Sequence, residues 1–166
     1  MDYRTKYCEW PAFTITGVSS ITVSGGEIFD AVRRDGRWEA LRRLGGADAT
    51  LYGVASFDKA GSQGAYRYTL GVKDPVVTAG DLLGGETLFS LPIRQAGWLV
   101  FELDDFAAQW GEFWRDDPYR LVRELGWVYD ARVGLHIDVF PPTFVGEQDA
   151  VAFMMPVKRA PKGAGA

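Results

Sequence analysis

The sequence has few of the side chains that bind metals or form cross-links. Cys8 is the single cysteine and His136 the single histidine among 166 residues. One cysteine excludes an internal disulfide, and the pair falls short of the Cys and His sets that hold zinc. We therefore expect no metal and no cofactor. A reducing cytoplasm fits this cysteine content best.

Long apolar runs are also missing. No stretch approaches the roughly 20 apolar residues that a membrane span needs, and the first residues lead into no apolar core of signal-peptide length. Lys and Arg number 18 against 22 Asp and Glu, a formal net charge of -4, and they form no long basic patch. We expect neither a membrane nor nucleic acid as a direct partner.

Common catalytic motifs are absent as well. The chain has no Gly-x-Ser-x-Gly sequence, and the pair Gly25-Gly26 lacks the remaining spacing of a nucleotide-binding loop. Standard hydrolase or kinase chemistry is therefore not supported. His136 is interpreted as a surface or core histidine, because a lone histidine is seldom a ligand.

Aromatic residues, in contrast, are abundant. The chain contains 6 Trp, 7 Tyr and 10 Phe, which make up 14% of its residues. Large aromatic side chains fill cores, but they also line pockets for flat apolar ligands. Composition does not separate these two uses, so the positions of the aromatics have to decide.

The pattern of apolar residues predicts strand, helix, strand, strand in the first half. Residues 13–23 are rich in β-branched side chains, and residues 26–44 have helical spacing with an interruption near 35–36. Two strands follow at 50–57 and 65–72, separated by a loop rich in glycine, serine and charge.

The second half repeats this order of elements after a connector at 73–86. The predicted elements are strands at 87–91 and 97–103, helices at 106–114 and 118–125, and strands at 134–140 and 150–157. We predict an α+β fold with one domain over residues 1–160. Its pseudo-repeats cover about 12–73 and 86–159, and residues 161–166 form a disordered tail.

Three local motifs accompany this order. They are Tyr68-Thr69-Leu70-Gly71-Val72, Leu91-Pro92 leading to Gly97-Trp98-Leu99-Val100-Phe101, and Ile137-Asp138-Val139-Phe140 ahead of Met155-Pro156-Val157-Lys158. With the element order, they resemble the GyrI-like small-molecule-binding family, which includes effector-binding domains of AraC-type and MerR-type multidrug regulators. The family's usual Glu and Tyr are replaced here by Asp138 and Phe140.

The resemblance implies two strand-helix-strand-strand modules, of the SHS2 type, related by a pseudo-twofold axis. They would share an antiparallel sheet, with ligands in a central groove that has an acidic residue deep inside it. Asp138, on an alternating apolar strand, is the candidate acid. It is either a ligand-facing carboxylate or a structural acid paired with an arginine such as Arg132, and the resemblance favours the first. An apolar groove would raise its pKa.

Further residues are candidates for the groove wall. Each has an alternative structural interpretation: core packing for the tryptophans and for Phe153 and Met155, a solvated edge for Glu102, and a half-buried sheet surface for the tyrosines. The predicted ligand-binding set is Asp138, Tyr68, Tyr66, Trp98, Glu102, Trp110, Trp114, Phe140, Phe153 and Met155.

Two functions follow from this pattern. The first is binding of hydrophobic, aromatic and cationic small molecules, either to sense an effector or to sequester a toxin or drug. No helix-turn-helix segment is expected before the first predicted strand, so sensing would require a regulator partner protein. The alternative is hydrolysis of strained electrophilic molecules such as cyclopropanoids. Asp138 would then be the general acid or base and Tyr68 a polar assistant.

Overall fold

The computed structural model describes residues 2–46, 48–57, 64–75 and 87–163. The strands are β1 (Arg4–Trp10), β2 (Phe13–Thr22), β3 (Leu51–Ser56), β4 (Tyr66–Lys73), β5 (Phe89–Ile93), β6 (Ala96–Leu103), β7 (Trp127–Tyr129), β8 (Leu135–Phe140) and β9 (Val151–Arg159). The helices are α1 (Gly25–Arg34), α2 (Arg37–Gly45), α3 (Phe106–Arg115) and α4 (Pro118–Glu124).

All nine of these strands belong to one antiparallel sheet, which agrees with the predicted α+β fold. Its order is β1-β6-β9-β8-β3-β4-β2-β5, and β7 pairs with β9 outside this path. The centre is the pairing of β3 with β8, which joins the first half of the chain to the second. In that register Gly53 lies opposite Asp138.

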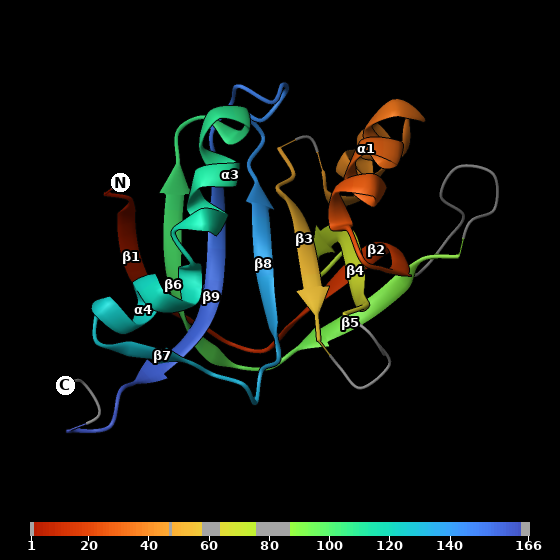
Figure 1. Ribbon diagram of the computed structural model, residues 1–166. Coiled ribbons are helices and arrows are strands. Elements are labelled where there is room, and N and C mark those ends of the chain that lie inside the picture. The colour runs from red at the N-terminus through yellow and green to blue at the C-terminus, as the bar shows by residue number, and fades with distance from the viewer. Residues whose placement is uncertain (1, 47, 58–63, 76–86, 164–166) are drawn as a thin grey trace.

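The helices cover one face of the sheet (Figure 1), and local sequence signals fix where they begin and end. The predicted interruption of the first helix is confirmed: Gly36, with φ 88°, separates α1 from α2 in a conformation that suits glycine. Asp105 caps α3 by accepting a hydrogen bond of 2.9 Å from the backbone N–H of Ala108. Pro118 occupies the first turn of α4. None of the described helices is long and apolar enough to cross a membrane.

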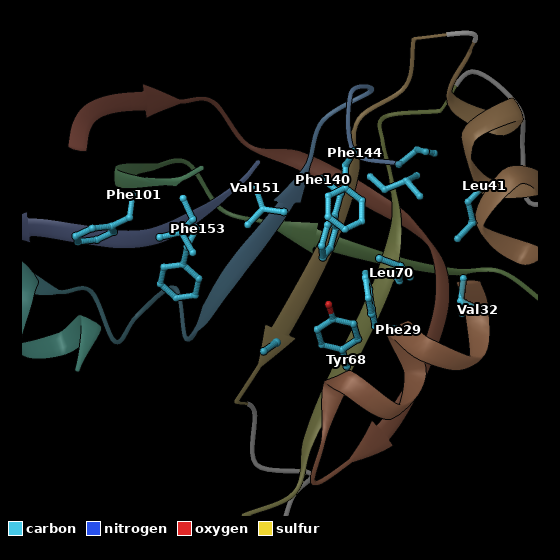
Figure 2. Packing of buried hydrophobic residues seen from close by; sticks show 14 of the residues in the cluster. Phe29, Val32, Leu41, Tyr68, Leu70, Phe101, Phe140, Phe144, Val151 and Phe153 are labelled. Carbon is cyan, nitrogen blue, oxygen red and sulfur yellow. The ribbon is translucent and has the colours of Figure 1, made fainter. Parts of the chain in front are cut away.

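Two apolar clusters lie on opposite faces of the sheet. The larger one packs the helices onto the sheet, and Figure 2 shows its side chains from α1, β4, β8 and β9 together. Alternation along β6 separates the two: Leu99 and Phe101 join the larger cluster, whereas Trp98 and Val100 join the second. Any ligand site between helices and sheet must therefore use the first set of positions.

The N-terminus differs from expectation. Residues 4–10 form β1, a strand that we did not predict, and it pairs with β6 from Arg4↔Glu102 to Trp10↔Ala96. β1 lies at the edge of the sheet, and most of its side chains are exposed. It therefore lacks the alternation of apolar and polar residues by which a half-buried strand is recognised. The three-residue β7 was missed too, because it is too short for a periodic pattern.

Two predicted segments fall mainly outside the described residues. The connector at 73–86 is described only up to residue 75, and the predicted disordered tail at 161–166 only up to residue 163. The remaining elements of the second half lie within a few residues of their predicted positions.

Candidate functional site

A cavity of about 170 Å³ lies on the helix-covered face of the sheet. Its floor comes from β3, β4 and β8, and its walls come from α1 and α3. The lining residues are Gly25, Gly26, Phe29, Ala55, Tyr66, Tyr68, Phe106, Trp110, Trp114, His136, Asp138 and Phe140. The cavity is thus mainly aromatic, with a few polar groups on its floor.

Asp138 is the acid of this floor, and its side chain is buried, with 8% of the residue's surface exposed. The Tyr68 hydroxyl donates a hydrogen bond of 3.1 Å to its Oδ2, whereas Oδ1 has no hydrogen-bond partner among the described residues. Burial raises the pKa of Asp138 to about 7, and the bond from Tyr68 opposes that rise in part. The expectation of a raised pKa is therefore met.

The structural alternative for Asp138, an ion pair with Arg132, does not occur. Arg132 instead forms an ion pair with Asp130, at 3.0 Å between Nη2 and Oδ2. The two residues are two positions apart in the turn before β8, so Arg132 pairs with an acid that is close to it in sequence. Within the described part of the chain, the cavity carboxylate has a tyrosine, not a cation, as its partner.

Tyr68 is held in place by two glycines. A Cβ atom at Gly25 would lie 2.8 Å from the Tyr68 ring, and one at Gly53 would lie 2.0 Å from its hydroxyl oxygen. The ring therefore fills space that only glycine leaves open on both sides. Burial and the nearby carboxylate raise the pKa of Tyr68 well above its ordinary value, so its hydroxyl keeps its proton.

His136 lies two positions before Asp138 on β8 and also lines the cavity. Its ring is 5.3 Å from that of Trp114, 4.9 Å from that of Phe153 and 5.2 Å from that of Phe57, measured between centroids. Burial lowers its pKa to about 4, so the imidazole is neutral near pH 7. Its Nδ1 has no partner among the described residues.

The walls are built from stacked and tilted rings. On α3, Trp110 contacts Phe106 at 5.1 Å and Trp114 at 6.0 Å. From α1, Phe29 stacks on Phe140 at 5.1 Å. Such surfaces offer both apolar area and electron-rich faces to a flat or cationic guest.

Six of the ten predicted ligand-binding residues come together around this cavity. They are Asp138, Tyr68, Tyr66, Trp110, Trp114 and Phe140. Phe153 and Met155 are on the same face but fully buried beneath it, where Phe153 supports Trp114 at 5.4 Å and His136 at 4.9 Å. Tyr66 accepts a 2.7 Å hydrogen bond from the backbone N–H of Gly25 and so ties β4 to the start of α1.

The other two predicted residues lie away from the cavity. Trp98 is fully buried in the second cluster, on the opposite face of the sheet. Glu102 is four residues after Trp98, on the same strand face, and its carboxylate lies 3.5 Å from Nε of Arg4 and 3.6 Å from Nζ of Lys6. Alternation puts both side chains on the face without helices, so neither is part of the site proposed below.

Several lining residues were not predicted to be part of a site. Phe29 and Phe106 were interpreted only as parts of amphipathic helices, and His136 as a surface or core residue. The sequence could have indicated His136 as a lining residue, because a period of two puts it on the same strand face as Asp138. For Phe29 and Phe106 no local signal distinguishes cavity from core, because α1 and α3 are far apart in sequence.

No protein-family model and no curated protein matches the sequence. Among solved structures, a Staphylococcus aureus MU50 protein provisionally classed as a transcription regulator gives a TM-score of 0.66 at 14% identity, covering 95% of this chain and 99% of that one. SAV2435, solved with bound tetraphenylphosphonium, also gives 0.66 at 14% identity, covering 95% and 94%.

EcmrR, solved in a complex with DNA, gives a TM-score of 0.59 at 10% identity, covering 95% of this chain and 58% of the longer EcmrR chain. At these identities the likeness concerns the fold. The chain therefore shares its α+β fold with a protein provisionally classed as a transcription regulator, with a protein solved in a complex with DNA, and with a protein solved with a bound organic cation.

Proposed function

We propose that this protein is a GyrI-like small-molecule-binding protein that takes up hydrophobic, aromatic and cationic compounds in the cavity between α1 and α3. The observation that carries the proposal is Asp138. It is a buried carboxylate, one oxygen of which has no hydrogen-bond partner among the described residues, and it lines the same cavity as the rings of Tyr68, Trp110, Trp114 and Phe140. Without a cationic partner, the ionised form of a buried acid is costly, so a ligand that supplies a positive charge would stabilise that form.

The surrounding rings favour the same class of ligand. Aromatic faces attract cations, and the attraction grows when water is excluded. The carboxylate adds a full negative charge once the ligand displaces its proton. SAV2435 with bound tetraphenylphosphonium supports this ligand class, since the two chains share a fold over nearly their whole length.

The two-module arrangement belongs to the same proposal. Supporting it, the sheet reads β2-β4-β3 on one side of its centre and β6-β9-β8 on the other, so equivalent elements of the two halves lie at mirrored positions in the strand order. A pseudo-twofold axis would then pass between β3 and β8, next to the cavity. Binding there would serve effector sensing, with a regulator partner, or sequestration in the cytoplasm.

Titration with tetraphenylphosphonium tests the proposal. Tryptophan fluorescence should change on binding, because Trp110 and Trp114 line the cavity. At about pH 8, where Asp138 is ionised, Asp138→Asn should weaken binding about tenfold or more, the equivalent of about 1.4 kcal/mol. Glu102→Gln removes the same charge on the opposite face and should change affinity little. Equal affinity in wild type and Asp138→Asn would refute the role of the carboxylate.

Hydrolysis of a strained electrophile is the second candidate. The observation in its favour is the burial of Asp138 in the cavity lining, which raises its pKa to about 7, a value that suits a general acid or base near neutral pH. Tyr68 would hold the carboxylate in place by its hydrogen bond. Incubation with an epoxide or a reactive cyclopropane, followed by mass spectrometry, tests this candidate. Turnover that is equal in wild type and Asp138→Asn would exclude catalysis by Asp138.

A further inference from the structure

The aromatic floor of the cavity continues along the sheet beyond the residues that line it. On β3, Ala55 lines the cavity and lies opposite Tyr68 of β4 and His136 of β8. Phe57 is two positions further along the chain, so a period of two puts its side chain on the same face as that of Ala55. A backbone hydrogen bond of 2.9 Å from the N–H of Phe57 to the carbonyl of Gly134 continues the pairing of β3 with β8 to this position.

Ring contacts agree with this placement of Phe57. Its ring is 5.6 Å from that of Tyr66 and 5.2 Å from that of His136, measured between centroids. Both of these residues line the cavity. Phe57 therefore extends the aromatic surface of the cavity outward by one further ring.

Exposure to solvent rises along this surface with distance from Asp138. Tyr68, which donates its hydrogen bond to Asp138, is 4% exposed, Tyr66 is half-buried, and Phe57 is 45% exposed. Single exposed apolar residues are common on protein surfaces, but an exposed ring that continues the wall of a cavity indicates a site of ligand contact. The floor is thus buried at Asp138 and open to solvent at Phe57.

The cavity by itself is too small for the whole of a bulky cation. At about 170 Å³ it is close to an engineered cavity of about 150 Å³ in another protein that binds benzene. Tetraphenylphosphonium has four phenyl rings on one phosphorus atom, so the cavity can enclose about one of them. The other rings need apolar surface outside it, and the exposed end of the floor at Phe57 offers such a surface.

We propose that Phe57 is a specificity-determining residue, which selects organic cations with several aromatic rings by packing against a ring that stays outside the cavity. This proposal rests on the proposed function and narrows its ligand class. A ligand ring on Phe57 contributes buried apolar area and a favourable contact between two rings. A cation with a single ring, enclosed by the cavity, makes no such contact.

Two cations of equal charge test the proposal on the unmodified protein. Tetraphenylphosphonium has four rings and phenyltrimethylammonium has one, and neither has an ionisable group. Isothermal titration calorimetry should show tetraphenylphosphonium binding at least about tenfold more tightly. Equal affinities for the two cations would overturn the proposal.

Variants of Phe57 then locate the preference. Phe57→Ala should weaken binding of tetraphenylphosphonium about fivefold or more and change the affinity for phenyltrimethylammonium less than about twofold. Phe57→Tyr keeps the ring and should bind both cations as the wild type does. Leu125→Ala is the matched control and should alter neither affinity, because Leu125 is similarly exposed, at 47%, and follows α4 outside the cavity lining.

The outcomes separate this proposal from the proposed function. If Phe57→Ala leaves the ratio of the two affinities unchanged, Phe57 does not determine specificity, and the proposed function stands as long as tetraphenylphosphonium binds the wild type. If neither cation binds the wild type, the proposed function is wrong and this proposal falls with it. Where phenyltrimethylammonium binds too weakly for calorimetry, Phe57→Tyr decides. A loss of tetraphenylphosphonium affinity as large as that in Phe57→Ala would overturn the role of the ring.

Discussion

The hydroxyl of Tyr68 reaches Oδ2 of Asp138 across the strand that separates their own strands. Tyr68 is on β4 and Asp138 on β8, and both strands pair with β3. The residue of β3 opposite Asp138 is Gly53, and a Cβ atom there would lie 2.0 Å from the hydroxyl oxygen. The hydrogen bond between the two halves of the chain thus depends on a position without a side chain.

Gly53→Ala should therefore destabilise the protein. The added methyl group must displace a tyrosine that Gly25 confines on its other side, and overpacking of this kind costs about 1–3 kcal/mol. Urea denaturation measures the free energy of unfolding. Gly111→Ala is the control, because a Cβ atom there meets open space on the exposed side of α3, and it should be neutral or stabilising by up to about 1 kcal/mol. Equal effects of the two substitutions would show that Tyr68 is not confined.

Tyr68→Phe should raise the pKa of Asp138 further. The Tyr68 hydrogen bond lowers that pKa against the effect of burial, and a bond to a charged group contributes about 1.5–3 kcal/mol, so a rise of about one to two units is expected. NMR titration of the Asp138 side-chain carboxyl carbon measures it. Tyr66→Phe removes a hydroxyl that accepts from the Gly25 backbone and should leave the pKa within a few tenths of the wild-type value. An unchanged pKa in Tyr68→Phe would contradict the hydrogen bond.

Stability should respond to pH through two opposed groups. The pKa of Asp138 in the folded state, about 7, lies above its ordinary 3.8, so its contribution to stability is lost as pH rises from about 4 to 7. The pKa of His136, about 4, lies below its ordinary 6.5, so its contribution is lost as pH falls from 6.5 to 4. Between about pH 4 and 6.5 the two slopes nearly cancel.

Replacing either Asp138 or His136 should reveal how the remaining group changes stability with pH. Relative to the wild type, Asp138→Asn should gain about 3 kcal/mol of unfolding free energy between about pH 4 and 6.5, and His136→Phe should lose a similar amount. Urea denaturation at a series of pH values measures both differences. If the unfolding free energy of both variants changed with pH as that of the wild type does, neither Asp138 nor His136 would have the shifted pKa that its burial on β8 implies.

Arg42 should stabilise the segment that follows β8. Its guanidinium donates hydrogen bonds to the backbone carbonyls of Pro141, Pro142 and Phe144, at 3.1, 3.2 and 2.8 Å respectively. Arg42→Gln should cost about 1–3 kcal/mol and speed hydrogen exchange of the Phe144 amide, which bonds to the Pro141 carbonyl. Arg43→Gln, at an exposed position of α2, should change neither quantity. Unaltered exchange in Arg42→Gln would exclude this anchoring role.

Much of the fold could be predicted because the signals are local. The break between α1 and α2 follows from a glycine in the helical pattern, and the faces of β6 follow from a period of two. β1 gave no such signal, because a mostly exposed edge strand owes its place to pairing with β6 rather than to its own pattern.

The candidate site could be predicted only in part. The alternation of β8 singled out Asp138, and helical spacing brought Trp110 and Trp114 to one side of α3. A period of two puts Trp98 and Glu102 on one face of β6, yet that face lies opposite the cavity. The pattern of a strand separates its two faces but does not say which of them the helices cover.

The sequence by itself determined the order of the elements, the faces of the strands and an acid within an apolar strand, since neighbouring residues fix these properties. Only the tertiary structure decided that β3 pairs with β8, that Gly53 lets Tyr68 reach Asp138, and that Phe29 and His136 line the same cavity. These relationships join residues far apart in the chain. They depend on which surfaces bury one another on folding, and no local pattern encodes that choice.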